Sequence, residues 1–326
     1  MADSIRNTIK RIFNADSLTI DFLNEWFDDS LYITAHTSGS TGTPKAIKLL
    51  KADMLISAKT TCEFFNITSD SNLVLPLSPN YIAGKMMIVR AIYAGAKLWI
   101  ESPSNKPLIQ DYGMIDLLPI VPSQSEWLTT GCKYTKNIRN LIIGGGVLSK
   151  KQAADINNLK INAYATYGMT ETCSHVALRH ISSEIYQTLP NFTISIDNRN
   201  CLIIKSNEMS FKELATNDII DLIDSNHFKW LGRYDNVINS GGIKIFPESI
   251  EEKLHGIIPY PFYITSEQDD KWGEIVALCI ESEPFNAEHI LNTIKKTLDK
   301  YLVPKKVIFI SQFSRTESGK IKRTKF

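Results

Sequence analysis

The chain has 326 residues, of which 43% are hydrophobic and 22% are charged, and its formal net charge is +1. This length exceeds that of most single domains, so we expect two domains in a chain whose composition is typical of soluble globular proteins. The low net charge gives no reason to expect nucleic acid as a partner, no apolar run is long enough to span a membrane, and the five dispersed cysteines predict reduced thiols in the cytoplasm rather than disulfides or zinc sites.

The first part of the chain alternates apolar strands with helices. Apolar residues at helical spacing predict helices over residues 4–13, 52–66, the later part of 78–91, and 108–118. Short apolar runs predict strands at residues 31–34, 46–49, 73–77, 96–100, 141–143 and 162–166. This alternation predicts a layered α/β fold, in which glycine turns at the strand ends are the usual place for a ligand.

From about residue 192 the pattern changes to short strands, which predict a small β subdomain. These strands are expected at residues 192–196, 201–204, 219–222 and 228–231. A compact α+β unit follows, with a helix beginning at Pro247, another over 286–302, and strands at 262–265, 274–280 and 307–310. We therefore expect a large N-terminal domain over residues 1–234 and a small C-terminal domain over 235–326.

The segment from His36 to Lys45 reads H-T-S-G-S-T-G-T-P-K, with five hydroxyl side chains, two glycines and a closing lysine. Glycine lets the backbone approach a ligand closely, and backbone N–H groups with hydroxyls in such a turn can hold an anion. The segment therefore predicts a loop that binds nucleotide phosphates. It is not a Walker A loop, because its glycines are three apart and Ala46 follows the lysine. A polar surface loop is the alternative for any one of these residues taken singly.

The string T-S-G-S-T-G-T-P-K resembles the phosphate loop of the acyl-adenylate-forming enzymes, which include acyl-CoA ligases, the adenylation domains of peptide synthetases, and luciferases. Tyr167–Glu171 looks like the Y-G-x-T-E motif of this superfamily, and Gly144–Val147 resembles its glycine turn along the adenosine. Thr216–Asp218 stands where the family has T-G-D. Asparagine replaces the glycine there, so a plain surface turn is an alternative.

Two further matches lie in the C-terminal third. Gly232–Ile238, followed by Ser240-Gly241-Gly242, is similar to the segment between the two domains of the family. Ser314–Arg323 looks like the C-terminal motif that carries a catalytic lysine, here Lys320. The resemblance thus extends from residue 34 to the end of the chain.

The resemblance implies a role for each matching residue. The catalytic residues would be Lys320, Glu171 and Thr170, and the Glu171 carboxylate would hold Mg²⁺, a cation that prefers oxygen ligands. Asp235 would be the hinge of a mobile C-terminal domain, and the CoA channel would be lined by Ser240, Gly241 and Gly242. The residues that bind ATP or AMP would be Thr37, Ser38, Gly39, Ser40, Thr41, Gly42, Lys45, Gly144, Gly145, Gly146, Tyr167, Gly168, Asp218 and Arg233.

With its short length and these motifs, the chain is similar to short o-succinylbenzoate–CoA ligases of menaquinone synthesis. This implies an AMP-forming ligase that uses ATP, CoA and Mg²⁺ to activate the succinyl carboxylate of a dianionic aromatic keto acid. The second carboxylate of such an acid would need a cation or hydrogen-bond donors, and the nearest candidates by sequence are Tyr81, Lys85, Arg90 and His175. A structural role is the alternative for each of them, and longer relatives have histidine near the position of Tyr81.

Two other functions are open. One is an aryl- or acyl-CoA ligase for another acid. The other is a non-catalytic sensor of acyl-adenylates or nucleotides, which is disfavoured because Glu171, Arg233 and Lys320 occur together. Only a short segment precedes the phosphate loop, whereas most family members have a much longer one. The shortened front predicts exposed apolar surface that a second copy of the chain could cover as a homo-oligomer.

Overall fold

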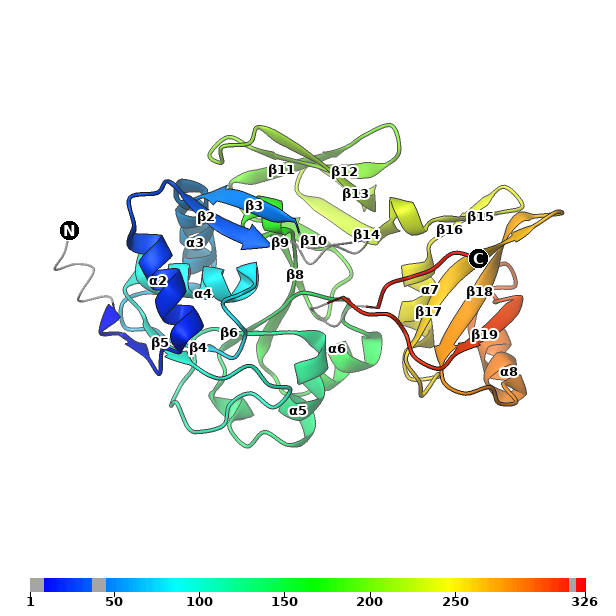
Figure 1. Ribbon diagram of the computed structural model, residues 1–326, viewed down its shortest axis with the longest axis horizontal. Coiled ribbons are helices and arrows are strands. Elements are labelled where there is room, and N and C mark those ends of the chain that lie inside the picture. The colour runs from blue at the N-terminus through cyan, green and yellow to red at the C-terminus, as the bar shows by residue number, and fades with distance from the viewer. Residues whose placement is uncertain (1–8, 37–44, 317–320) are drawn as a thin grey trace.

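The computed structural model describes residues 9–36, 45–316 and 321–326. Figure 1 shows a large unit built from the first part of the chain and a smaller unit, at the right of the view, built from its last part. The large unit combines parallel strands with helices, which confirms the expected α/β fold. No helix in the described ranges has the length and apolar character needed to cross a membrane.

Parallel strands form the centre of the large unit. Strands β6, β7 and β8 pair in parallel, as do β1, β5 and β4, and a bridge between Leu73 and Leu117 connects the two groups. Their bounds are Ile12–Phe13 (β1), Asn72–Leu75 (β4), Lys97–Ile100 (β5), Leu118–Ile120 (β6), Asn140–Ile143 (β7) and Asn162–Gly168 (β8). Parallel strands have their carboxyl ends at one edge, which is where ligands bind in such sheets.

Separate cores cover the two faces of these strands, because successive strand residues point to opposite sides. Leu73 and Leu75 of β4 belong to the core that contains α3 and α4, whereas Val74 belongs to the core that contains α5 and α6. The helices of the large unit are Ser17–Phe27 (α2), Lys51–Phe65 (α3), Ile82–Ala94 (α4), Ser125–Thr130 (α5) and Lys150–Asn157 (α6). Short 3₁₀ turns cover Pro122–Gln124 (η1), Thr135–Asn137 (η2), Thr170–Thr172 (η3) and Tyr234–Asn236 (η4).

The expected small β subdomain is present, and its strands continue the same sheet. The order β11-β12-β13-β14-β10-β9-β8-β7-β6 makes one nine-stranded sheet, antiparallel from β8 outward. The strands are His175–His180 (β9), Tyr186–Thr188 (β10), Phe192–Ile196 (β11), Cys201–Ser206 (β12), Glu213–Leu222 (β13) and His227–Arg233 (β14). A separate antiparallel ribbon consists of Tyr32–His36 (β2) and Ala46–Leu50 (β3).

The C-terminal unit is a five-stranded sheet with two helices. Among the described residues, its core is made of residues from Ile238 onward, including Ile250, Leu278 and Ile294. The strands are Ile238–Ser240 (β15), Ile243–Ile245 (β16), Phe262–Asp269 (β17), Gly273–Glu281 (β18) and Lys306–Ile310 (β19), and the helices are Pro247–Leu254 (α7) and Glu288–Thr297 (α8). The expected helix over 286–302 is thus real but shorter.

One expected helix is wrong and another ends before its expected last residue: of the helix over 4–13, residues 4–8 lie outside the described residues and Ile9 is helical. Its last two residues, Ile12–Phe13, are a strand instead, because they pair with β5 and the Phe13 ring stacks on Trp99 with centroids 4.2 Å apart. The expected helix over 108–118 is the wrong one, since these residues contain no helix. The Ile115 N–H donates to the Asn137 carbonyl at 2.7 Å, so the backbone bonds to neighbouring segments instead of to itself. Helical spacing alone did not reveal these long-range partners.

Candidate active site

The ribbon of β2 and β3 holds both ends of the predicted phosphate loop. His36, the last residue of β2, pairs with Ala46, the first residue of β3, so the chain leaves and re-enters the ribbon at the same end. Lys45 directly precedes β3 and is exposed. The other predicted loop residues, Thr37, Ser38, Gly39, Ser40, Thr41 and Gly42, lie outside the described residues.

Tyr167, Asp218 and Arg233 come together at the end of β8, where β13 and β14 pass. The Tyr167 hydroxyl donates to one Asp218 carboxylate oxygen at 2.7 Å, and the Trp230 indole N–H donates to the other at 3.1 Å. Arg233 is the cross-strand partner of Asp218, with Nε 3.9 Å from the carboxylate. Burial, followed by the charge of Asp218, raises the pKa of Tyr167 well above its usual value. The hydroxyl therefore stays protonated and holds the carboxylate in place.

Thr216–Asp218 lies within strand β13, so the alternative of a plain surface turn is wrong. The Thr216 hydroxyl accepts from the Asp218 backbone N–H at 3.1 Å. Asp218 is itself 8% exposed and carries two side-chain donors, so it is a pre-positioned acceptor beside Arg233. A carboxylate and a guanidinium arranged in this way can hold the two hydroxyls of a ribose.

The glycine turn and the Tyr167 segment occupy adjacent strand ends. Gly144 follows β7, and a Cβ on it would lie 2.7 Å from the Thr166 hydroxyl of the neighbouring β8. Gly145 has φ +78°, a conformation that favours glycine. A Cβ on Gly146 would have ordinary contact with Pro122 at 3.5 Å. The turn thus presents bare backbone beside the strand that ends in Tyr167.

Gly168 brings the chain ends of β8 and β9 into very close approach. A Cβ here would lie 2.2 Å from the backbone oxygen of Ser174 and 2.6 Å from the Cα of His175. The turn between them, Thr170–Thr172, packs against β3 of the phosphate-loop ribbon. Glu171 in this turn is exposed and Thr170 is half-buried. The structure therefore brings the Y-G-M-T-E segment to the base of the predicted phosphate loop.

We expect Gly168→Ala to distort this junction, because the atom that an added methyl would meet is backbone and cannot rotate away. Overpacking of this kind typically costs about 1–3 kcal/mol of unfolding free energy. Thermal and urea unfolding would measure the loss. Gly146→Ala is the matched control, since its Cβ has room, and it should unfold close to wild type. Equal stability of the two variants would contradict the packing described here.

The residues around Glu171 fit a magnesium ion held jointly with a substrate. Glu171 offers an exposed carboxylate, and the described residues contain no cluster of three or more histidine, cysteine or acidic side chains that could form a complete cage. Mg²⁺ usually binds through one or two carboxylates plus substrate phosphates. An exposed glutamate beside a phosphate loop suits that mode.

Arg90 and His175 lie in a buried polar network behind the Gly168 junction. Arg90, in α4, is 2% exposed, and its Nη2 donates to the Ser174 hydroxyl at 2.5 Å. Its Nε has no partner among the described residues, and burial lowers its pKa to about 10. Within the described ranges no carboxylate pairs with this guanidinium. A buried cation with a neutral partner is an unusual arrangement unless an anionic ligand completes it.

Lys85 and Tyr81, which were also candidates to bind the second carboxylate of the acid, lie outside the Arg90 network. The Lys85 ammonium lies 3.8 Å from the Glu25 carboxylate and 4.6 Å from the centre of the Phe22 ring. Its charge is therefore used within the protein, and the structure favours the structural alternative. Tyr81 precedes α4 and is 41% exposed. It does not join the Arg90 network in the described contacts.

The predicted hinge and CoA channel lie where the chain passes into the C-terminal unit. Asp235 sits in the η4 turn, with its carboxylate 3.3 Å from Arg233. Ser240 ends β15, and Gly241 and Gly242, with φ +57° and +82°, form a two-residue hairpin turn to β16. Both positive φ angles are typical of a type I′ turn, which explains the glycine pair structurally.

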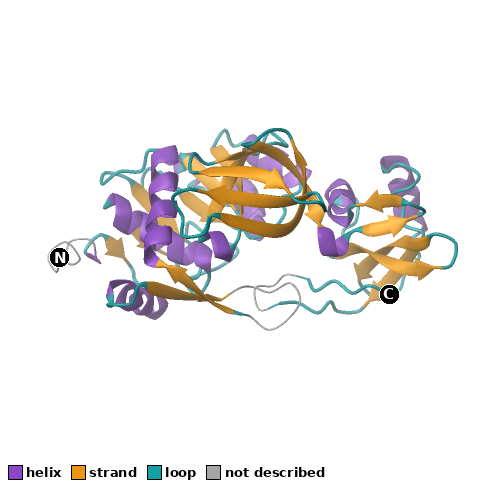
Figure 2. Cartoon of the chain, turned by 90° about the horizontal axis from the view of Figure 1, so that it is seen from above, coloured by secondary structure: helices purple, strands orange, loops and turns teal. Residues whose placement is uncertain are grey.

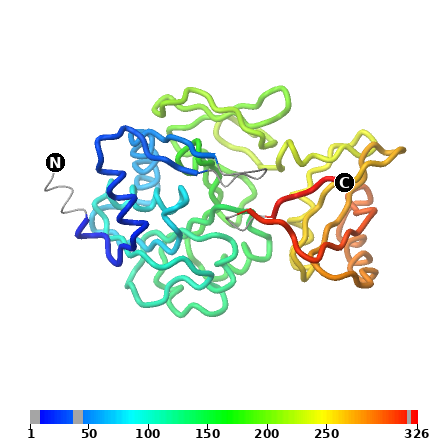
Figure 3. Tube along the Cα trace, viewed as in Figure 1, coloured from blue at the N-terminus to red at the C-terminus, as the bar shows by residue number. Residues whose placement is uncertain are grey.

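Lys320 lies outside the described residues, but the segments on either side of it are firmly held. Arg315 makes a two-pronged ion pair with Glu281, with contacts of 2.6 and 2.5 Å, and Arg323 makes another with Glu251 at 2.6 Å. Figures 1 and 2 show these flanking segments directed toward the large unit, on the side where β2 ends and β3 begins. The tube in Figure 3 follows the same path of the C-terminal residues.

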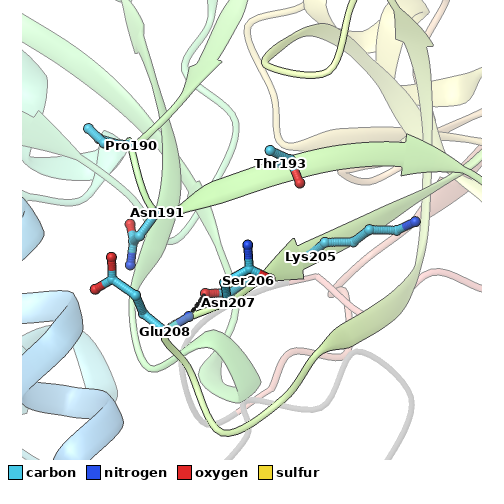
Figure 4. A pocket seen from close by; sticks show the side chains of 7 residues that line it. All are labelled: Pro190, Asn191, Thr193, Lys205, Ser206, Asn207 and Glu208. Carbon is cyan, nitrogen blue, oxygen red and sulfur yellow. Dashed lines mark hydrogen bonds between the residues drawn. The ribbon is translucent and has the colours of Figure 1, made fainter.

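A hollow of about 160 Å³ lies elsewhere on the large unit (Figure 4). Its lining includes Asn191, whose amide atoms are buried without a partner among the described residues. The lining residues are Pro190, Asn191, Thr193, Lys205, Ser206, Asn207 and Glu208, and none of them was predicted as a site residue. The hollow is therefore separate from the site to which the motifs point.

The sequence reasoning missed Ser174, Thr61 and Trp230. Ser174 follows Glu171 by three residues, so its place next to the motif was a usable signal. Thr61, which contacts His175, and Trp230, which contacts Asp218, come from distant parts of the chain. Only the tertiary fold reveals these two.

The comparisons with known proteins agree with this geometry. The family model described as "AMP-binding enzyme" matches residues 17–209, which is more than half of the chain. A structure of an acyl-CoA synthetase (AMP-forming)/AMP-acid ligase II-like protein from Dyadobacter fermentans is 32% identical, with a TM-score of 0.63, over 93% of this chain and 91% of that one. The chain belongs to the AMP-binding enzyme family, which confirms the resemblance drawn from its motifs.

Two relatives are named for one particular acid. The 2-succinylbenzoate–CoA ligase of Listeria monocytogenes is 25% identical over 333 residues, covering 94% of this chain and 71% of the relative. The structure of the o-succinylbenzoate CoA synthetase of Bacillus subtilis with its acyl-adenylate intermediate is 21% identical, with a TM-score of 0.80, over 89% of this chain and 67% of that one. At this identity the structural likeness concerns the fold.

Proposed function

We propose that the chain is an ATP-dependent, AMP-forming acid–thiol ligase that adenylates 2-succinylbenzoate and transfers the acyl group to CoA. The observation that carries the choice of acid is the buried Arg90 guanidinium, whose described side-chain partner is the neutral Ser174 hydroxyl. Ser174 is held against Gly168, so this cation lies directly behind the nucleotide motif. In an acid with two carboxylates, the second carboxylate would pair with the Arg90 guanidinium and neutralise its charge, while the first faces ATP.

The proposed reaction has two steps. A carboxylate oxygen of the succinyl group bonds to the α-phosphorus of ATP, and the bond to the leaving pyrophosphate breaks. The CoA sulfur then bonds to the acyl carbon, its proton is lost, and AMP leaves with that carboxylate oxygen. The first step brings two anions together, so the positive charges of Lys45 and Lys320 and the loop N–H groups would stabilise it.

The nucleotide would be held by the residues that meet at the strand ends. Asp218 and Arg233 would bind the ribose, and the backbone of Gly144, Gly145 and Gly146 would lie along the adenosine beside Tyr167. Magnesium, bound by Glu171 and the phosphates, would neutralise charge on the pyrophosphate. We also propose a cytoplasmic location and a domain boundary between residues 234 and 235. Formation of a homo-oligomer stays a prediction.

The direct test combines ATP, Mg²⁺, CoA and a panel of carboxylic acids, followed by quantification of AMP and identification of acyl-CoA by mass spectrometry. We expect AMP and the acyl-CoA with 2-succinylbenzoate. Products only with simple benzoates or fatty acids would retain the ligase class but overturn the choice of acid. No AMP with any acid would favour a nucleotide sensor.

Asp235→Pro tests the proposed hinge. Proline fixes φ near −65° and suits the η4 turn seen here, so the variant should retain this arrangement and resist rotation. We expect adenylation near the wild-type rate and thioester formation slowed on the order of tenfold or more, about 1.4 kcal/mol of barrier. Asp235→Ala controls for loss of the carboxylate. Single-turnover measurements would give the rates of adenylation and of thioester formation separately. Equal slowing of both steps by proline would argue against a hinge here.

A further inference from the structure

Thr61 and His175 form a hydrogen-bonded chain that ends at the Ser174 hydroxyl. The His175 ring nitrogens lie 3.1 Å (Nε2) from the Thr61 hydroxyl and 3.4 Å (Nδ1) from the Ser174 hydroxyl. Thr61 is fully buried and His175 is 6% exposed. Both ring nitrogens therefore already have protein partners, so His175 is not available to bind the acid.

The donors along this chain are fixed in direction. The Thr61 hydroxyl donates to the Ser57 carbonyl at 3.0 Å, so its oxygen accepts from the Nε2–H of His175. A neutral imidazole with Nε2 protonated has Nδ1 as an acceptor, and the Ser174 hydroxyl can donate to it. Burial, followed by the charge of Arg90, lowers the pKa of His175 well below its usual value, which agrees with a neutral ring.

We infer that Thr61 and His175 are positioning residues that direct the Ser174 hydroxyl proton away from Arg90, so that the serine oxygen accepts from the guanidinium and holds it toward the acid. Ser174 can accept from Arg90 at 2.5 Å because its own proton is taken by His175. The inference rests on the proposed function, in which Arg90 binds the second carboxylate. Without the chain the guanidinium keeps its charge but loses its fixed orientation.

Helix α3 offers a closely matched control pair. Thr60 and Thr61 are adjacent, both are buried, and each donates to the carbonyl four residues earlier, at 2.9 and 3.0 Å. Of the two, Thr61 also contacts His175. Thr60→Val and Thr61→Val therefore remove the same group from the same helix, and they differ in the link to His175.

The experiment measures KM and kcat for 2-succinylbenzoate and for benzoylpropionate, which lacks the aryl carboxylate. We expect Thr61→Val to raise the KM of the diacid about threefold to tenfold, the usual effect of one internal hydrogen bond, and to leave the monoacid near wild type. Thr61→Ser should restore the diacid KM, and Thr60→Val should change neither acid. In a Ser174→Ala background Thr61→Val should add no further loss, because the two residues act in series.

Equal effects of Thr60→Val and Thr61→Val, or equal losses on both acids, would overturn the inference. So would independent, additive losses from Thr61→Val and Ser174→Ala. If wild type uses the diacid and these variants fail the pattern, the positioning chain alone is wrong. If wild type does not use the diacid, the proposed function fails and the inference fails with it.

Discussion

Lys320→Ala should greatly slow the first half of the reaction and spare the second. The lysine charge would pair with the carboxylate and the α-phosphate only while they react. Removing one preorganised donor to a developing charge costs about 100- to 1,000-fold in rate, and loss of a full charge can cost more. Rapid-quench measurement of adenylate formation from ATP and the acid would give this loss. The second half, thioester formation from a supplied acyl-adenylate, should stay near wild type because the small domain would have turned about Asp235.

Lys322→Ala is the matched control for Lys320→Ala. Lys322 lies two residues further along, in the described segment, where its backbone N–H donates to the Ser314 carbonyl at 2.8 Å. That bond does not depend on the side chain, so the substitution removes one positive charge and leaves the backbone in place. If Lys322→Ala slowed adenylation as much as Lys320→Ala, general charge would be the cause. If Lys320→Ala slowed both halves equally, the rotation of the small domain would be contradicted.

Arg90→Met should separate binding of the second carboxylate from stability. Truncating one side of a buried charged hydrogen bond typically costs about 2–5 kcal/mol, so kcat/KM for 2-succinylbenzoate should fall accordingly, mainly through KM. Benzoylpropionate should be little affected. The folded protein should not lose stability, because the buried charge has no carboxylate partner among the described residues and methionine fills a similar space.

Lys85→Met provides the contrast on the same helix. Its ammonium interacts with Glu25 and Phe22, so its loss should lower the melting temperature and affect both acids alike. Steady-state kinetics with the two acids and thermal unfolding of both variants would distinguish a binding role from a structural one. Equal loss of the diacid and the monoacid in Arg90→Met would show that Arg90 is only structural.

Each motif is a local signal at a strand end, so the sequence shows where the motifs lie in the fold, and their roles in binding stay predictions. Gly144 and Gly168 lie where the backbone closely approaches a neighbouring side chain or another stretch of backbone, and glycine is the residue type that allows this approach. Asp218 and Arg233 are joined by the pairing of β13 with β14, and Tyr167 of β8 reaches them through its hydrogen bond to Asp218. The α/β class followed from the alternation of apolar runs.

The errors and omissions share a cause, which is that long-range partners override local pattern. Residues 108–118 have helical spacing, but Leu108 adopts φ +62° and its N–H donates to the Glu101 carboxylate at 2.9 Å. Lys85 and Arg90 looked alike as cations in one helix. Only the fold shows that Glu25 neutralises Lys85, while Arg90 has a neutral serine partner. No local feature of the sequence links Glu25 to Lys85, and the position of Ser174 beside the motif did not by itself link it to Arg90.

The most direct test of the proposed reaction follows the oxygen atom that changes bonds. The substrate is 2-succinylbenzoate labelled with heavy oxygen in its succinyl carboxylate alone, and the enzyme would convert it in the presence of ATP, Mg²⁺ and CoA. Mass spectrometry would then measure the mass of the AMP that is formed. We expect AMP to carry one heavy oxygen, because the carboxylate attacks the α-phosphorus and leaves its oxygen there when CoA takes the acyl group. Unlabelled AMP formed together with the acyl-CoA, or label in AMP only when the aryl carboxylate carries it, would contradict the proposed reaction.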